Sequence, residues 1–189
     1  MRIYLVRHPQ PEIGKEFCYG STDLVVDPHE LEKVLASLMV HLPKDALLFS
    51  SPLQRCAGLA QALAEHMTTL IKFDARLVEM NFGTWELRAW NDIPRAEIDA
   101  WAEDVVNYQP GGGECVLQMA QRVASFYQEL CLHQQDSIVI CHAGTIRLLL
   151  ACHRGLTPLQ MADFAANNSH QIGYGEIVTL ACTVKPVRF

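Results

Sequence analysis

Two histidines in this sequence follow directly on short apolar, β-rich runs. His8 comes after one run with Arg7 beside it, and His142 comes after another. Arg55 lies in the first turn of a predicted helix that follows a third such run. An arginine at a helix N-terminus opposes the helix dipole unless an anion lies between them. These residue types at equivalent strand ends predict a pocket for phosphate or carboxylate.

The elements that position these side chains alternate along the chain. Apolar β-rich runs predict buried strands at residues 3–6, 46–49, 70–73 and 137–141, and one or two β segments from Gly175 onward. Helical spacing, caps and breakers predict helices from Asp27-Pro28 to Pro43, after Ser51-Pro52, after Pro94, from the 111–113 glycine turn to about residue 132, and after Thr145.

Alternating strands and helices favour an α/β fold, with helices on both faces of a mostly parallel sheet. Ligands bind such sheets where the carboxyl ends of the strands open. The loops at residues 7–8, 50–55 and 142–145 should therefore converge on one crevice. This convergence is the central structural expectation from the sequence.

Length and charge limit the classes of function. A chain of 189 residues predicts a single domain, 1–189. Its net charge of −6 argues against nucleic acid as a partner, because non-specific attraction to a polyphosphate is missing. A small basic pocket can still bind one phosphate in an acidic protein.

The seven cysteines are scattered, odd in number and form no Cys-x-x-Cys pair. This pattern argues against a disulfide framework and against a structural zinc site. The apolar run at the N-terminus is too short for a signal peptide, and no later run approaches a membrane span. We expect a cytoplasmic protein without membrane contact. The sequence leaves a homodimer open.

Several segments resemble the histidine phosphatase superfamily, in its branch with cofactor-dependent phosphoglycerate mutase and small-molecule phosphatases. They occur in the order found in that branch, from residue 3 to about residue 150. The segments are Leu-Val-Arg-His at 5–8, Ser-Pro-Leu-Gln-Arg at 51–55, the stretch 77–86 around Glu79, Pro-Gly-Gly-Gly-Glu at 110–114 with Arg122 following, and Cys-His-Ala-Gly-Thr-Ile-Arg at 141–147.

The resemblance implies a three-layer α/β/α, phosphoglycerate mutase-like fold and a metal-independent phosphomonoesterase without a cofactor. It implies that His8 attacks phosphorus and becomes a phosphohistidine. Arg7, Arg55 and His142 would bind the phosphoryl oxygens, with Ala143 also at the substrate. Glu79 would protonate the leaving alkoxide and then activate water. The substrate would be a small phosphorylated metabolite.

Two details bear on the substrate. Residues 18–23, Cys-Tyr-Gly-Ser-Thr-Asp, resemble the α-ribazole-5′-phosphate phosphatases of cobalamin biosynthesis. Pro9 stands where the family usually has Gly followed by Glu, and proline cannot donate a backbone N–H to phosphate. The Asn that the family often has a few residues later is not evident, and we expect Tyr19, Gly20 and Ser21 to replace that polar contact through backbone or hydroxyl donors.

Three alternatives remain open. Cys141 and Arg147, between a strand and a helix, have the spacing of cysteine-dependent phosphatases, but Ile146 replaces the expected Gly and this interpretation leaves His8 and Glu79 unexplained. A mutase-type phosphotransferase would need longer insertions than this chain accommodates. A phosphate-binding regulatory protein with little turnover is the third alternative, suggested by Pro9.

Overall fold

The central sheet has five strands within residues 1–168 and 171–182, which the computed structural model describes. The strand order is β3-β2-β4-β1-β5, and every pair is parallel except the β1–β5 pair. β1 and β2 both lie beside β4, so their carboxyl ends meet at one edge. The strands are β1 (Arg2–Arg7), β2 (Leu47–Ser50), β3 (Ile71–Phe73), β4 (Ser137–Cys141) and β5 (Ile177–Ala181).

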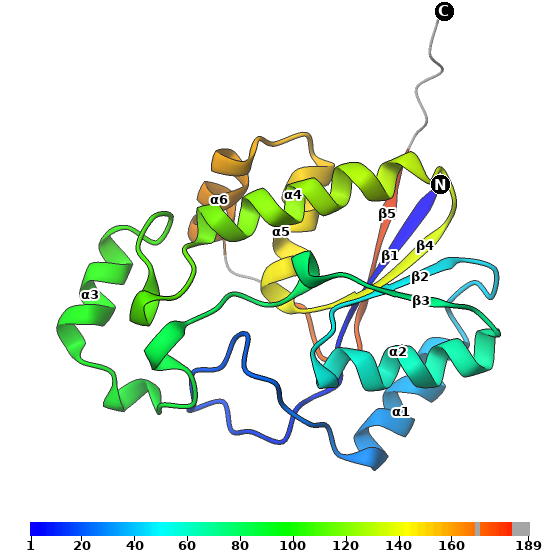
Figure 1. The fold of residues 1–189 in the computed structure, drawn as a ribbon, viewed down its shortest axis with the longest axis horizontal. Helices are drawn as coiled ribbons and strands as arrows, with labels where there is room; N and C mark the ends of the chain where they lie inside the picture. Colours follow the sequence, from blue (N-terminus) through cyan, green and yellow to red (C-terminus); the bar gives the residue numbers. More distant parts are fainter. Residues whose placement is uncertain (169–170, 183–189) are drawn as a thin grey trace, which may run out of the picture.

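Helices cover both faces of this sheet, as the sequence predicts (Figure 1). The helices are α1 (Pro28–Met39) and α2 (Gln54–Met67) on one face, α4 (Val116–Leu132), α5 (Ala143–His153) and α6 (Pro158–Asn167) on the other, and α3 (Arg95–Glu103) beyond the sheet. The fold is therefore a three-layer α/β/α arrangement with a mostly parallel sheet.

Alternation along the strands divides the core between the two faces. In β1, Ile3 and Leu5 pack with α4, α5 and α6, whereas Tyr4 and Val6 pack with α1 and α2. Successive side chains of a strand point to opposite faces, so a sheet covered on both sides needs apolar residues at every position. This requirement explains the continuous apolar runs that predicted the strands.

Local capping fixes the start of α1 as expected. The Asp27 side chain accepts hydrogen bonds from the backbone N–H groups of His29 and Glu30, and Pro28 occupies the first turn. The helix ends at Met39, earlier than the predicted stop at Pro43.

Helix α6 was not predicted from the sequence. Its start has a readable signal, because Thr157 and Gln160 form a capping box around Pro158. The predicted tail from Gly175 contains one described strand, β5, and residues 183–189 lie outside the described part. None of the described helices is long and apolar enough to cross a membrane.

Candidate active site

The two histidines meet at the carboxyl ends of neighbouring strands. His8 follows β1 and its backbone N–H donates to the carbonyl of Cys141 at the end of β4 (3.0 Å). The centroids of the His8 and His142 rings are 5.0 Å apart. The parallel register that pairs Arg7 with Cys141 places both histidines at one edge, as the sequence predicts.

His8 is oriented by the backbone of the residue that follows it. Its Nδ1 lies 2.6 Å from the Pro9 carbonyl oxygen, which can only accept, so Nδ1 carries the proton and Nε2 keeps its lone pair. The side chain is 3% exposed. Burial, reinforced by the charges of Arg55 and Arg7, lowers the His8 pKa from 6.5 to about 3. Pro9 donates nothing to the site, but its carbonyl fixes the tautomer of His8.

His142 is also a neutral imidazole, contacted by Arg55, by Ser51 and by the Cys56 thiol, whose Sγ lies 3.5 Å from Nε2. Its Nδ1 accepts from Nε of Arg55 (3.3 Å), and its Nε2–H donates to Oγ of Ser51 (2.9 Å). Burial and the nearby His8 and Arg55 hold the pKa of His142 well below its ordinary value. The role of Ser51 was not predicted, although its position directly after β2 is the signal that pointed to the histidines.

Arg55 is 1% exposed in the first turn of α2. Its Nη1 donates to the carbonyl of Thr22 (2.6 Å), and its Nη2 donates to the carbonyl of Gly20. Within the described residues these hydrogen bonds, and the one to His142, all go to neutral acceptors. A buried guanidinium with neutral partners is suited to an anionic ligand.

Arg7 precedes His8 at the end of β1 and is half-buried. Its Nη1 donates to the Ile172 carbonyl (2.6 Å), and its guanidinium carbon lies 3.8 Å from the centroid of the Tyr174 ring. Nε of Arg7 is buried and lacks a hydrogen-bond partner among the described residues. That N–H is available to a phosphoryl oxygen.

Tyr174 is a site residue that sequence reasoning missed. Its hydroxyl is 2.8 Å from the Tyr19 hydroxyl, and its ring centroid is 5.6 Å from that of His8. Tyr174 lies in a loop before β5, outside any predicted strand end. Its flanking glycines, Gly173 and Gly175, were the available sign of a special turn.

Glu79 is held against the start of α5. Its Oε2 accepts from the Gly144 N–H (2.9 Å) and its Oε1 from the Met80 N–H (3.0 Å). A Cβ at position 144 would lie 2.4 Å from Glu79 Oε1, so only glycine permits this approach. Ala143, the first residue of α5, lines the same cavity as Glu79.

The backbone that carries Glu79 is held by a further arginine, Arg122. Arg122 of α4 donates through Nη1 to the carbonyls of Arg76 (2.8 Å) and Val78 (2.6 Å), and it forms a bidentate ion pair with Glu114. The Arg122 side chain thus spans from α4 to the loop that ends at Glu79. In the sequence, Arg122 was singled out only because it follows the segment 110–114 that resembles the histidine phosphatases.

The segment 18–23 mainly positions Arg55, and its Ser21 donors are not free to bind a ligand. Both the N–H and the hydroxyl of Ser21 donate to Glu86 Oε1 (2.9 and 2.8 Å). A Cβ at Gly20 would lie 1.9 Å from the Met80 carbonyl oxygen, which explains the glycine there. Tyr19 remains at the site, whereas the donors of Ser21 are directed to Glu86.

Cys141 has the surroundings of a core residue. It is 0% exposed, and burial raises the pKa of its thiol well above the ordinary value. Arg147, its partner in the cysteine hypothesis, donates to the carbonyls of Ala165 and Asn168. This geometry opposes a thiolate nucleophile at Cys141.

Imidazoles, guanidiniums and a carboxylate at the carboxyl ends of parallel strands define an α/β protein built for phosphoryl transfer. Comparison with known families is specific: the model of the histidine phosphatase superfamily (branch 1) matches residues 3–173. The chain belongs to this superfamily, and the protein is a hydrolase of the histidine phosphatase class.

The proteins that are similar to this chain are named for different substrates. The chain is 30% identical over 159 residues to the adenosylcobalamin/alpha-ribazole phosphatase of Salmonella typhimurium, covering 80% of this chain and 78% of that protein. It is 26% identical over 182 residues to the glucosyl-3-phosphoglycerate phosphatase of Mycobacterium tuberculosis, covering 87% and 79%. The crystal structure of the alpha-ribazole phosphatase from Shigella flexneri matches with a TM-score of 0.82 at 24% identity, covering 97% and 91%, and supports the fold.

Proposed function

We propose that this chain, acting as one domain, hydrolyses a small phosphomonoester through a phosphohistidine on Nε2 of His8. One observation carries the proposal. The Pro9 carbonyl accepts a hydrogen bond from Nδ1–H of His8, so a lone pair on Nε2 is available near the buried guanidinium of Arg55 and the half-buried one of Arg7. A neutral imidazole is the form that can attack phosphorus.

In the proposed complex, the phosphoryl oxygens lie between Arg7, Arg55 and His142. The unpartnered Nε of Arg7 and the neutral partners of Arg55 leave their charge available to an anion. Negative charge spreads over these oxygens in the transition state, so preorganised cations lower the barrier. The positive charge comes from the protein, so we expect activity without a metal ion.

Glu79 is proposed as the acid and base of the reaction. In the first step the Nε2–P bond forms, the ester P–O bond breaks, and Glu79 gives its proton to the leaving oxygen. In the second step Glu79 takes a proton from water, the water oxygen bonds to phosphorus, and the Nε2–P bond breaks. The net reaction converts ester and water into alcohol and phosphate, and Glu79 ends protonated as it began.

For the substrate, α-ribazole-5′-phosphate of cobalamin biosynthesis is the first candidate. It is supported by two relatives named adenosylcobalamin/alpha-ribazole phosphatase, from Salmonella typhimurium and Escherichia coli, at 30% and 28% identity. The segment 18–23 resembles the same group. The alternative activity is that of a mutase-type phosphotransferase, which would use the same phosphoryl-transfer chemistry.

The test uses purified protein with EDTA, p-nitrophenyl phosphate and α-ribazole-5′-phosphate. We expect hydrolysis of both esters, an acid-labile phosphoenzyme in quenched reactions, and loss of both in His8→Ala by about a thousandfold or more. Cys141→Ser is the matched control and should retain hydrolysis.

Other outcomes would contradict the proposal in distinct ways. Retained hydrolysis in His8→Ala with loss in Cys141→Ser would indicate the cysteine mechanism. Transfer of the phosphoryl group between phosphoglycerates would indicate a mutase. Binding of inorganic phosphate with no turnover of any ester would indicate a regulatory protein.

A further inference from the structure

Two cavities of different character meet at Tyr19. One, the apolar cavity, has a volume of about 260 Å³ and extends from Glu79 and the start of α5 toward α4 and α6. The other, the cationic cavity, has a volume of about 660 Å³ and is lined by Arg7, Lys15 and Tyr174. The alcohol part of a bound phosphoester could extend into either one.

The position of Glu79 decides between them, on the basis of the proposed function. A general acid must come within hydrogen-bond distance of the leaving oxygen. Glu79 lines the apolar cavity and not the cationic one. A third cavity, beside Arg122, also reaches Glu79. Gly144, whose N–H binds the Glu79 carboxylate, lines the apolar cavity and does not line this third one. The leaving group therefore extends into the apolar cavity.

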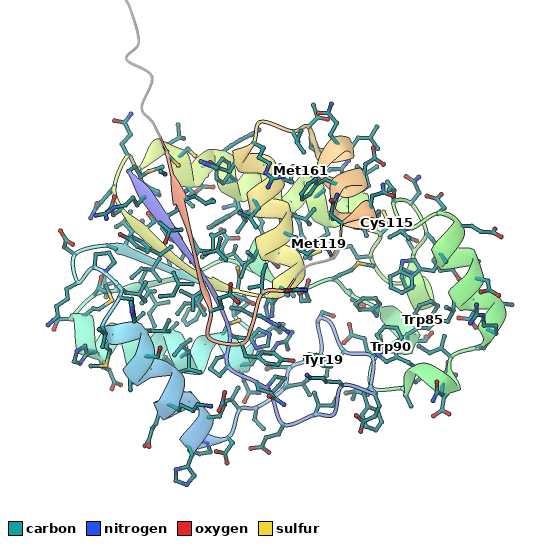
Figure 2. The ribbon with its side chains drawn as sticks, turned by 180° about the vertical axis from the view of Figure 1, so that it is seen from behind. Tyr19, Trp85, Trp90, Cys115, Met119 and Met161 are labelled. Carbon is teal, nitrogen blue, oxygen red and sulfur yellow. The ribbon has the colours of Figure 1, made fainter. Side chains whose placement is uncertain are left out.

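The walls of this cavity are mostly hydrocarbon. Figure 2 labels Met119, which lines it from α4, and Tyr19, which lines it from the opposite segment. Phe82 and Trp101 meet edge to face, with ring centroids 5.9 Å apart, and form an aromatic wall. Further apolar wall residues are Val116, Leu148 and Ala166.

Arg147 is the cation among the described residues that line the apolar cavity. Its Nη2 donates to the carbonyls of Ala165 and Asn168, so part of its donor capacity is used within the protein. Burial lowers the pKa of Arg147, because the charged form is solvated less well there than in water. A charged group on the substrate would lose its hydration in this cavity and find mostly apolar contacts.

We infer that the substrate is a phosphate ester of an alcohol carrying an uncharged, apolar ring, and that the apolar cavity binds this ring. Phe82, Trp101 and Met119 then determine specificity, because they contact the ring and not the phosphate. Esters whose alcohol carries a carboxylate or an ammonium group are poor substrates, because the charged group would lose its hydration in the apolar cavity.

The test compares esters that share an alkoxide leaving group. We expect kcat/KM for 2-phenylethyl phosphate to exceed that for ethyl phosphate by about tenfold to a hundredfold, the effect of burying a ring. O-phosphoserine and 3-phosphoglycerate should react no faster than ethyl phosphate. The ratio is taken within one enzyme preparation, so a general loss of activity cancels.

Ala166→Phe fills the cavity from α6 and should lower the phenylethyl-to-ethyl ratio at least tenfold. Ala36→Phe, the same change at an exposed position of α1, should leave the ratio unchanged. A ratio near one in the unchanged protein, or a preference for 3-phosphoglycerate that Arg147→Met removes, would overturn the inference while His8-dependent hydrolysis stands. Absence of any ester hydrolysis would overturn the proposed function and this inference together.

Discussion

At the scale of single residues, the site combines neutral imidazoles with the guanidiniums of Arg7 and Arg55, which have no carboxylate partner among the described residues. Arg55 and Arg7 disfavour a proton on His8, in addition to the effect of burial. Without a ligand, His8 is therefore kept in the neutral form that the proposed attack on phosphorus requires. A bound phosphate would neutralise the arginines and offset this repulsion. In the proposed mechanism the same two charges would keep His8 neutral and bind the phosphoryl group.

Arg122 is predicted to act on catalysis by positioning Glu79. We expect Arg122→Met to displace the loop that carries Glu79. It is made together with Glu114→Gln, so that no half-buried carboxylate is left unpaired. An alkoxide needs the proton from Glu79, whereas p-nitrophenolate leaves without it. The kcat/KM for ethyl phosphate should fall about tenfold or more, and that for p-nitrophenyl phosphate less than threefold.

Glu79→Gln serves as the reference for this experiment, because it removes the acid directly and should show the same dependence on leaving group. Equal losses for both esters in the Arg122 variant would instead show that Arg122 only stabilises the fold.

At the scale of elements, the segment 18–23 is held in place by Glu86. The carboxylate of Glu86 accepts from Ser21, from Thr22 and from the N–H of Phe82. The carbonyls of Gly20 and Thr22 in turn fix the guanidinium of Arg55. The hydrogen bonds lower the pKa of Glu86 despite its partial burial, so it acts as a carboxylate. Glu86 thus links the segment 18–23 to Arg55, the arginine proposed to bind phosphate.

Glu86→Ala should therefore loosen this segment. We expect a loss of about 2 kcal/mol in the free energy of unfolding, because buried donors lose a charged acceptor. The KM for p-nitrophenyl phosphate should rise about tenfold as Arg55 loses its orientation. Urea unfolding and steady-state kinetics measure both effects.

Asp27→Ala is a suitable comparison, since it removes the N-cap of α1 and should cost about 1 kcal/mol without changing KM. If the Glu86 variant lost stability but kept the KM of the unchanged protein, Glu86 would have no part in orienting Arg55.

At the scale of the whole molecule, the site reduces stability in acid. His8 and His142 are buried and neutral, with pKa values below those of an unfolded chain. Below pH 6.5 the unfolded chain binds protons that the folded protein does not, so stability falls as the pH falls. For His8 this loss continues down to about pH 3.

Between pH 7 and pH 5, His8 alone should reduce the free energy of unfolding by about 2 kcal/mol. Urea unfolding at the two pH values, without phosphate, measures this difference. His8→Gln should remove about 2 kcal/mol of the pH dependence. His29→Gln, at an exposed position, is the control for the substitution itself. The carboxyl of Glu86 titrates below this window. An unchanged slope in His8→Gln would show that His8 takes up its proton in the folded state.

The sequence by itself determined the strands, most of the helices and the meeting of His8, Arg55 and His142. It could do so because buried strands need apolar residues on both faces, and because parallel strands bring their carboxyl ends to one edge. Glu79 came from the resemblance to a family.

Only the tertiary structure decided the contacts between segments distant in the chain. The packing of Tyr174 on Arg7, the reach of Arg122 to the Glu79 loop and the apolar cavity between α4, α5, α6 and residues 80–105 have no local signal. Each depends on how elements dock, and the period and caps of one element do not specify its neighbour. The convergence of His8, Arg55 and His142 was thus readable in the sequence, whereas the wall of the apolar cavity was fixed by packing alone.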